Sequence, residues 1–401
     1  MSLELSKLTA QVEVMGAALA QRRQDDAALL AQARSMLLAH GQVTDELRRK
    51  VATAHEADIS WRGADPLGAR LDERHAPAVE PRPATLIAAD GSQIYPDRHG
   101  IALYYLLNTG SIVLRQGGSQ APAVSTNPEV FYEDADLYDE TGRPRDPEYI
   151  NSQRDRRELE ALADLAEAER IALGGDLARP IVVLTDGPLL RWTPQRITDR
   201  EVVREVHHFT AQLERLRRSQ AVPFGYVDRP SSANVLRTVE LTTLAAEEIT
   251  RETVRHGRFR PLADRALFDD LAPNQRTGFF ASTSDLNDRY RRAGHRIVFF
   301  YLNVAQRPGP ENALIVRIEL PEWAAHESAG LDVAQAAVYA DCALSGFPYV
   351  LARAHELAVV GYVERHSLEA MLGQAMLRCG LQPVASTKAE AKRLTGSRSR
   401  R

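Results

Sequence analysis

The first part of the chain has the apolar spacing of a helix. Up to about residue 60 the sequence is rich in Ala, Leu, Gln and charged residues, and its apolar positions recur every three to four residues. From Gly63 to Pro83, four prolines interrupt this pattern, which predicts a linker. We therefore expect an N-terminal helical extension over residues 1–62 and a linker over residues 63–83. The apolar positions at helical spacing are Leu29, Leu30, Ala33, Leu37 and Leu38.

An α/β domain is expected over residues 84–395, followed by a basic tail over residues 396–401. Runs of apolar residues predict strands, and apolar residues every three or four positions predict helices. In chain order we expect a strand over 84–89, a hairpin of 101–108 and 111–116 around Thr109-Gly110, a loop over 117–149, a helix over 152–173, a strand over 181–185 and a helix over 197–218 with core positions Val203, Val206, Leu213 and Leu216. Further on we expect a strand over 222–227, a helix around 238–256, an irregular region over 265–288, a hairpin of 297–303 and 313–320, and a helix over 349–363 that begins after Pro348.

Composition excludes several classes of protein. With 401 residues and 44% hydrophobic content, the chain can bury a large core. Its two cysteines, Cys342 and Cys379, are far apart and support neither a disulfide framework nor a zinc site, so we expect a reduced, cytoplasmic protein. The beginning of the chain has no signal- or transit-peptide pattern, and no run of about 18 apolar residues predicts a membrane span.

The net charge of −4 does not indicate a nucleic-acid binder, but arginines are concentrated between Arg191 and Arg218. A solvated helix face explains such a cluster as well as phosphate contacts do.

Two Asp-Gly pairs follow apolar runs. Asp90-Gly91-Ser92 comes after the strand expected over 84–89, and Asp186-Gly187-Pro188 comes after the strand expected over 181–185. At the carboxyl ends of neighbouring strands, two such carboxylates can converge on a divalent cation, which favours chemistry on phosphates. The alternative is an ordinary turn, because Asp-Gly is a common turn dipeptide. The repetition of the pattern favours the metal site, although it does not exclude the turn.

A third carboxylate is expected on the helix over 152–173. Since this helix runs antiparallel to the following strand, its N-terminal half lies near Asp186. Glu158 is nearest the apolar stripe of this helix and is our first choice, with Glu160 second. Either could instead be an exposed helix charge.

His355 lies within the helix expected over 349–363. It shares a face with Leu351, Ala358 and Val359, so a hydrogen-bonded core histidine is the default interpretation. The functional interpretation is a metal ligand or a proton donor to a leaving oxygen.

The sequence resembles the NurA family of prokaryotic nucleases that process DNA ends. Four motifs carry the resemblance, in matching order and spacing over about residues 82 to 395: Ala89-Asp90-Gly91-Ser92, Leu184-Thr185-Asp186-Gly187-Pro188-Leu189-Leu190, Arg317-Ile318-Glu319-Leu320-Pro321-Glu322-Trp323 and Gly346-Phe347-Pro348-Tyr349-Val350-Leu351-Ala352-Arg353-Ala354-His355. The resemblance implies an RNase H-like mixed sheet flanked by helices, with Mn²⁺- or Mg²⁺-dependent 5′-to-3′ exonuclease and single-strand endonuclease activity. It also implies a homodimer that works on DNA with a hexameric HerA-type translocase.

By the same resemblance, Asp90 and Asp186 match the metal-binding aspartates, His355 the late catalytic histidine, and Glu158 or Glu160 the intervening glutamate. One motif departs from the family pattern, because Phe347-Pro348-Tyr349 stands where Tyr-Pro-Tyr is usual. The first tyrosine hydroxyl is missing, and Tyr349 is a candidate substitute.

In the expected mechanism, Asp90, Glu158, Asp186 and His355 surround one or two hard cations, about 4 Å apart if there are two, which activate water and stabilise the leaving 3′-oxygen. Candidate phosphate contacts are Arg191, Lys388 and Lys392.

Two other functions fit the residues. One is a catalytically weakened adaptor of the translocase, suggested by Phe347 and the N-terminal helices. The other is a metal-dependent phosphohydrolase of small molecules, which the carboxylates alone would permit.

Overall fold

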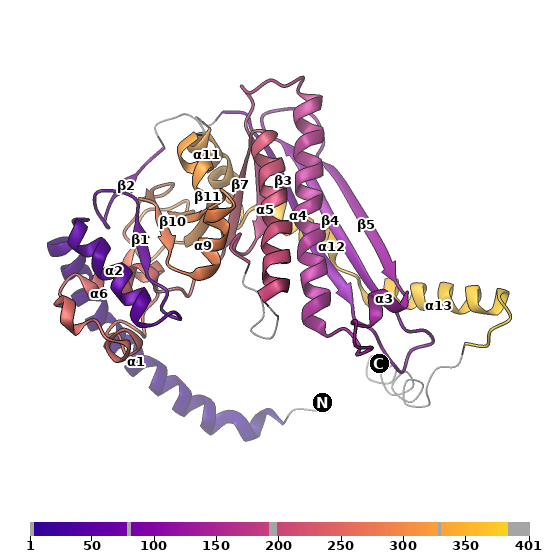
Figure 1. The fold of residues 1–401 in the computed structure, drawn as a ribbon, viewed down its shortest axis with the longest axis horizontal. Coiled ribbons are helices and arrows are strands. Elements are labelled where there is room, and N and C mark those ends of the chain that lie inside the picture. Colours follow the sequence, from indigo (N-terminus) through magenta and orange to yellow (C-terminus); the bar gives the residue numbers. More distant parts are fainter. Residues whose placement is uncertain (1–3, 78–81, 192–198, 328–329, 384–401) are drawn as a thin grey trace. The chain divides into compact units, whose positions relative to one another are not determined.

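The computed structural model describes residues 4–77, 82–191, 199–327 and 330–383, whose helices and strands are labelled in Figure 1 where there is room. The chain divides into two compact units. Unit 1 comprises Met1–Arg82, Asp186–Trp192 and Val222–Phe347, and unit 2 comprises Pro83–Thr185, Thr193–Ala221 and Pro348–Arg401. No helix in the described ranges is long and apolar enough to cross a membrane.

Unit 2 is built on a mixed sheet in the order β6-β3-β4-β5. β3, β4 and β5 form an antiparallel meander, and β6 runs parallel to β3. Helix α4 connects β5 to β6, and helix α5 follows β6. This order of strand directions and connecting helices is that of an RNase H-like core. The strands are β3 (Thr85–Ile94), β4 (Tyr105–Arg115), β5 (Ala123–Phe131) and β6 (Ile181–Asp186).

Two predicted turns of unit 2 are strand interiors instead. β3 continues through Asp90-Gly91-Ser92, and β4 continues through Thr109-Gly110, so the predicted hairpin around Thr109-Gly110 is wrong. The glycines are present because side chains or backbone of neighbouring helices approach the strands closely, which is a common reason for glycine inside a strand. Gly91 and Gly110, which suggested turns in the sequence, are therefore explained by the close approach of helices to the strands.

Helices cover both faces of this sheet. Along β3, the Ser92 hydroxyl donates to the Ala358 carbonyl of α12, whereas a Cβ at Gly91 would meet side chains of α4. Because successive strand residues face opposite sides, α12 and α4 lie on opposite faces. The helices of unit 2 are α3 (Asp134–Leu137), α4 (Pro147–Ala172), α5 (Asp199–Arg218), α12 (Tyr349–Ala358) and α13 (Tyr362–Arg378).

The ends and cores of these elements differ from expectation at three places. β5 and α3 occupy part of the predicted loop over 117–149, and α12 ends at Ala358 because Val359, with φ −58° and ψ 123°, leaves the helical conformation. Val203 is 55% exposed, unlike the buried Val206, so the predicted core position at Val203 is wrong. Predictions of polar strands and of helix ends were thus the least accurate.

Replacement of Gly110 by Ala is expected to destabilise unit 2. A Cβ at this position would lie 2.4 Å from the Ala358 nitrogen and 2.6 Å from the Ala354 oxygen, both backbone atoms of α12. Overpacking against a backbone that cannot rotate away lowers the free energy of unfolding by about 1–3 kcal/mol or more. Urea unfolding followed by far-ultraviolet circular dichroism measures this loss. Gly118→Ala is the control, since its nearest neighbour atom would be 3.4 Å away, and equal stability of the two variants would contradict the packing of α12 on β4.

Unit 1 contains an antiparallel sheet in the order β1-β9-β10-β11-β7, with β8 paired to β10 and to β2. The predicted hairpin of the last two strands is confirmed as β10 and β11. The strands are β1 (Ala64–Pro66), β2 (Arg74–His75), β7 (Ala221–Val227), β8 (Arg276–Thr277), β9 (Phe280–Ser282), β10 (Ile297–Asn303) and β11 (Ile315–Pro321).

Helices α1 and α2 pack in the core of unit 1. Ala33 and Leu37 of α1 and Leu47 of α2 share one apolar cluster with Val235 of α6 and Phe299 of β10. The single helix expected around 238–256 is instead broken into α6, a 3₁₀ turn and α7, since Ala245 and Thr250 have extended backbones. The α-helices of unit 1 are α1 (Thr9–His40), α2 (Asp45–Ala57), α6 (Asn234–Leu241), α7 (Arg251–Arg255), α8 (Asp264–Leu267), α9 (Asp285–Arg292), α10 (Glu322–Glu327) and α11 (Leu331–Asp341), with 3₁₀ turns at Leu5–Leu8 and Ala246–Glu248.

Candidate active site

Asp90 and His355 are in direct contact. Asp90 lies within β3, and its Oδ2 is 2.7 Å from Nδ1 of His355 in α12, while its Oδ1 accepts the N–H of Gly91 at 2.9 Å. The Asp90 side chain is 17% exposed and the His355 side chain is 67% exposed. His355 is therefore not the core histidine that its position beside Leu351 and Ala358 suggested. Its ring lies at the surface and is oriented by a carboxylate.

The packing of α12 explains how His355 reaches Asp90. The Asn108 amide donates to the carbonyls of Leu357 and Ala358 at 3.2 and 2.7 Å, at the last turn of the helix. Gly110, directly opposite Asp90 in the β3–β4 ladder, leaves room for the α12 backbone. These contacts hold the last turn of α12 against β4. His355, one turn earlier in the helix, is thereby held beside the Asp90 carboxylate.

Glu158 lies against the main chain next to Asp90. A Cβ at Gly91 would be 2.9 Å from Oε1 of Glu158, and Glu158 is only 5% exposed. Glycine at position 91 therefore leaves the space that the Glu158 carboxylate occupies. Since Asp90 and Gly91 face opposite sides of the sheet, Asp90 and Glu158 approach the strand from different faces.

Glu160 lies in a different environment. Its carboxylate is 3.1 Å from Arg157 and 3.5 Å from Nε2 of His208 in α5. Burial, together with the charge of Arg156, lowers the pKa of His208. The structure thus separates the two candidate glutamates, with Glu158 beside the Asp90-Gly91 backbone and Glu160 in an ion pair with Arg157 of its own helix, close to His208 of α5.

The predicted direction of α4 is confirmed by its other end. Glu169 bonds to Arg115 and to the Thr85 hydroxyl at the start of β3, whereas Glu158 reaches Gly91 further along the same strand. The helix therefore runs antiparallel to β3.

Arg154 is a neighbour of the site that was not predicted from the sequence. Its Nε is 3.2 Å from Glu158, and its guanidinium also bonds to Gln93 and Asp155. Burial alone would lower the pKa of Arg154, but the hydrogen bond to Asp155 and the charges of Glu158 and Asp90 raise it. Its spacing of four residues from Glu158 was the signal that could have revealed it.

Asp186 is the last residue of β6 and is exposed. The parallel ladder between β3 and β6 pairs Ala88 with Leu184. Asp90 lies two residues after Ala88, and Asp186 lies two residues after Leu184. Gly187 has φ +96°, a conformation that favours glycine, and its N–H donates to the Tyr226 carbonyl at 2.8 Å. The predicted sharp turn is confirmed here, in contrast to Asp90-Gly91.

The remaining predicted site residues are dispersed. Tyr349 is the first residue of α12 and is 43% exposed. Phe347 packs edge-to-face on Tyr226, with ring centres 5.4 Å apart. Arg191 is half-buried next to the end of a described range, and the predicted DNA contacts Lys388 and Lys392 lie outside the described residues.

The side chains near Asp90 fit a hard divalent cation. Carboxylate oxygens suit Mg²⁺ and Mn²⁺, and glycine at position 91 opens a cradle in which the Glu158 carboxylate meets the strand that carries Asp90. In the structure, the His355 imidazole lies beside the Asp90 carboxylate and the Arg154 guanidinium beside that of Glu158.

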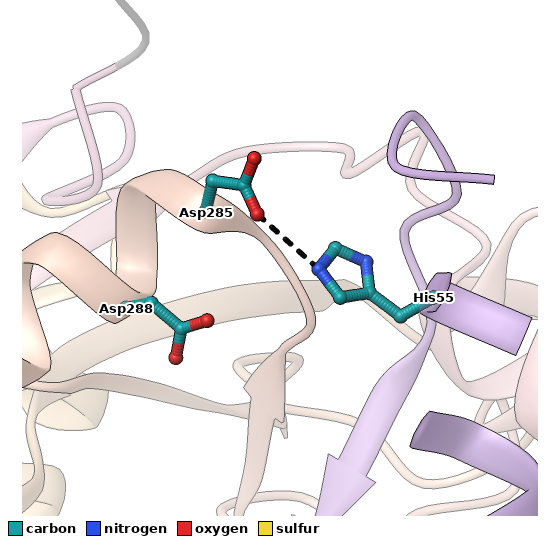
Figure 2. A group of neighbouring side chains, drawn as sticks. All are labelled: His55, Asp285 and Asp288. Carbon is teal, nitrogen blue, oxygen red and sulfur yellow. Dashed lines mark ion pairs between the residues drawn. The ribbon is translucent and has the colours of Figure 1, made fainter. Parts of the chain in front are cut away.

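A second cluster with metal-ligand chemistry lies in unit 1. Within the described ranges, only His55, Asp285 and Asp288 form a group of three His, Cys, Asp or Glu residues whose ligand atoms all lie within 4.8 Å of one another (Figure 2). His55 is 3.4 Å from Asp285, and Asp288 is 3.1 Å from Arg291. Both aspartates also lie in the first turn of α9, where negative charge is favourable. Ion pairs and the helix dipole thus account for this cluster without a cation.

The fold and the site define an α/β protein with an RNase H-like core and acidic residues on and beside its first strand. A family model described as the NurA domain matches residues 84–360, which is more than half of the chain. The chain therefore belongs to the NurA family of nucleases.

Two solved structures resemble the chain at low sequence identity. The NurA nuclease from Sulfolobus solfataricus is 11% identical, with a TM-score of 0.45 and coverage of 92% of this chain and 97% of that one. The catalytic domain of human endonuclease V is 14% identical, with a TM-score of 0.31 and coverage of 87% and 98%. No curated protein sequence matches the chain. The family assignment rests on the domain match.

Proposed function

We propose that this NurA-family protein is a metal-dependent deoxyribonuclease that processes DNA ends for recombinational repair. In this proposal it degrades strands from 5′ to 3′ and also cuts single strands internally. The observation that carries the proposal is the 2.7 Å contact between Asp90 and His355, with the Glu158 carboxylate packed on the neighbouring Gly91. A metal-binding carboxylate that orients a histidine is suited to phosphodiester hydrolysis.

By family resemblance, Asp90, Glu158 and Asp186 would hold one or two Mn²⁺ or Mg²⁺ ions. Such ions, when bound, activate water and stabilise negative charge on the phosphate and the leaving oxygen. Arg154 keeps the Glu158 carboxylate in place, and Asp90 orients the imidazole of His355 through Nδ1. Arg191 and the tail lysines Lys388 and Lys392 remain our candidates for contacts to DNA phosphates. Tyr349 remains our candidate to supply the hydroxyl group that the family's tyrosine has and Phe347 lacks.

His355 is proposed to act at the scissile phosphate, either as a metal ligand or as a proton donor to the leaving oxygen. Its other ring nitrogen, Nε2, is not engaged by Asp90, and the ring is exposed. We expect His355→Asn to lower the single-turnover rate on labelled single-stranded DNA about a hundredfold, as loss of a general acid does. If this variant binds Mn²⁺ more weakly than the wild type, His355 is a metal ligand. If Mn²⁺ binding is unchanged while the rate falls, His355 is a proton donor. A rate equal to that of the wild type would remove His355 from the site.

The activity itself is tested with purified protein, Mn²⁺ and DNA carrying a label at one end. Shortening of 3′-labelled strands from the 5′ end, together with internal cuts in single strands, is the expected result. Hydrolysis of p-nitrophenyl phosphate without DNA cleavage would favour the small-molecule phosphohydrolase. Absence of both reactions beside intact binding to a HerA-type hexamer would favour the adaptor.

We further propose a cytoplasmic homodimer that works with a hexameric HerA-type translocase, on the basis of family resemblance. The mass of the protein in light scattering, alone and with the translocase, tests both assemblies. A monomer at micromolar concentration would contradict the dimer.

A further inference from the structure

The turn that carries Asp186 is fixed by three contacts within unit 1. We call residues 186–190 the Asp186 loop. The N–H of Gly187 donates to the Tyr226 carbonyl, the N–H of Leu190 donates to Oε2 of Glu319 at 3.1 Å, and the loop backbone passes directly over Gly225. A Cβ at Gly225 would be 2.7 Å from the Leu189 nitrogen. The loop backbone is thus held from both β7 and β11.

Glu319 is a buried carboxylate with no role in the chemistry proposed above. It lies in β11, opposite Gly225 of β7 in the ladder, and is 3% exposed. Its Oε1 is 2.8 Å from Arg317, two residues earlier and therefore on the same face of the strand. One oxygen thus pairs with an arginine while the other accepts the main-chain N–H of Leu190.

Arg317 is itself held rigidly. Its guanidinium lies 3.5 Å from the ring centre of Phe299 and donates to the side-chain amide oxygen Oδ1 of Asn234 at 2.8 Å. Burial alone would lower the pKa of Arg317, but the charge of Glu319 raises it. A buried charge is costly unless it is paired and hydrogen-bonded. The carboxylate of Glu319 is therefore confined to the place where it meets Leu190.

The same arrangement gives Phe347 a packing role. Its ring contacts the ring of Tyr226, whose carbonyl accepts the N–H of Gly187. Glu319 of the motif Arg317–Trp323 thus contacts the Asp186 loop. Phe347 of the motif Gly346–His355 contacts Tyr226, which bonds to the same loop.

We propose that Glu319 is a positioning residue for Asp186: together with Gly225, it fixes the main chain of the Asp186 loop and so orients the Asp186 carboxylate toward a divalent cation. This inference rests on the proposed role of Asp186 as a metal ligand. Outer partners that orient metal ligands typically change metal affinity about 10- to 100-fold when they are removed.

The test is Mn²⁺ binding without DNA, measured from the electron paramagnetic resonance signal of free Mn²⁺. Glu319→Gln keeps the shape of the side chain, but its amide NH₂ must face either Arg317 or the Leu190 N–H, which are both donors, so one contact is lost. We expect its dissociation constant for Mn²⁺ to rise about 10- to 100-fold. Gly225→Ala, which moves the loop and leaves the Glu319–Arg317 pair intact, is expected to shift binding in the same direction.

Asn303→Ala is the control. Asn303 is buried in the same unit, and its side chain bonds to the main chain of Leu271, Ala305 and Leu314, contacts that do not involve Arg317 or Glu319. We expect a lower melting temperature with unchanged Mn²⁺ binding. An equal shift in this control would assign the effect of Glu319→Gln to general destabilisation and overturn the proposal.

Asp186→Asn separates this inference from the proposed function. If it binds Mn²⁺ and cuts DNA like the wild type, the proposed function loses a ligand and the role of Glu319 falls with it. If Asp186→Asn loses Mn²⁺ binding while Glu319→Gln and Gly225→Ala retain it, the proposed function stands and only the positioning role is overturned.

Discussion

Replacement of Asp90 by Asn is expected to lower the rate of DNA degradation at least about a thousandfold. A metal ion contributes several kcal/mol to the stabilisation of such a transition state, and about 4 kcal/mol corresponds to a factor of about a thousand. Asp90 also orients His355 through a 2.7 Å contact, so the substitution removes a cation ligand and weakens the placement of the histidine. The measurement is nucleotide release from single-stranded DNA at saturating Mn²⁺.

The control for Asp90→Asn must separate chemistry from folding. Asp164→Asn removes a carboxylate from α4 whose side chain is 68% exposed and pairs with Arg215. Exposed pairs of this kind contribute little to stability, so this variant should keep wild-type activity. Both variants should show the wild-type circular dichroism spectrum. Wild-type activity in a correctly folded Asp90→Asn variant would contradict the proposed site.

The second large effect is expected at Glu158, with Glu160 as its natural comparison. Glu158→Gln should reduce activity at least about a hundredfold, because the carboxylate that packs on Gly91 loses its charge and with it the ability to bind a hard cation. Glu160→Gln should keep activity within about threefold, because Glu160 pairs with Arg157 and His208. Single-turnover rates with a Mn²⁺ titration measure both.

The comparison of the two glutamates is decisive because they are two residues apart on one helix. A larger loss for Glu160→Gln would reverse the assignment. Equal small losses would show that neither glutamate is a ligand and would leave Asp90 and Asp186 as the only candidate carboxylates. Removal of Mn²⁺ with EDTA should abolish the activity of the wild type and of Glu160→Gln alike.

The buried strands and long helices of the fold could be predicted from the sequence. The apolar run before Asp90 and the run before Asp186 are adjacent parallel strands, and the helix between them lies close to its predicted bounds. β5 was missed because most of its residues are exposed and Pro128 lies within it, which is tolerated at the edge of a sheet. Edge strands carry little of the alternation on which such predictions depend.

Asp-Gly at positions 90 and 91 was misread for a related reason. The dipeptide favours a turn locally, but here the strand continues and the glycine makes room for Arg154 and Glu158. Tertiary packing that selects glycine cannot be distinguished from a turn signal in one sequence. At Gly187, by contrast, the positive φ makes the local interpretation correct.

Within the site, the helical period was enough to prefer Glu158 to Glu160, because that choice depends only on the faces of one helix. The roles of Arg154 and Glu319 were not predictable, because each depends on where separate segments meet. Glu319 contacts Leu190, which is 129 residues away in the chain. A buried charge inside an apolar strand is visible in the sequence, but its partner is not.

The central claim is most directly tested by a crystal structure with Mn²⁺, using anomalous scattering to locate the ions. We predict a peak bound by the carboxylates of Asp90, Glu158 and Asp186, with His355 beside it. A peak confined to His55, Asp285 and Asp288 (Figure 2), with none at Asp90, would contradict the account.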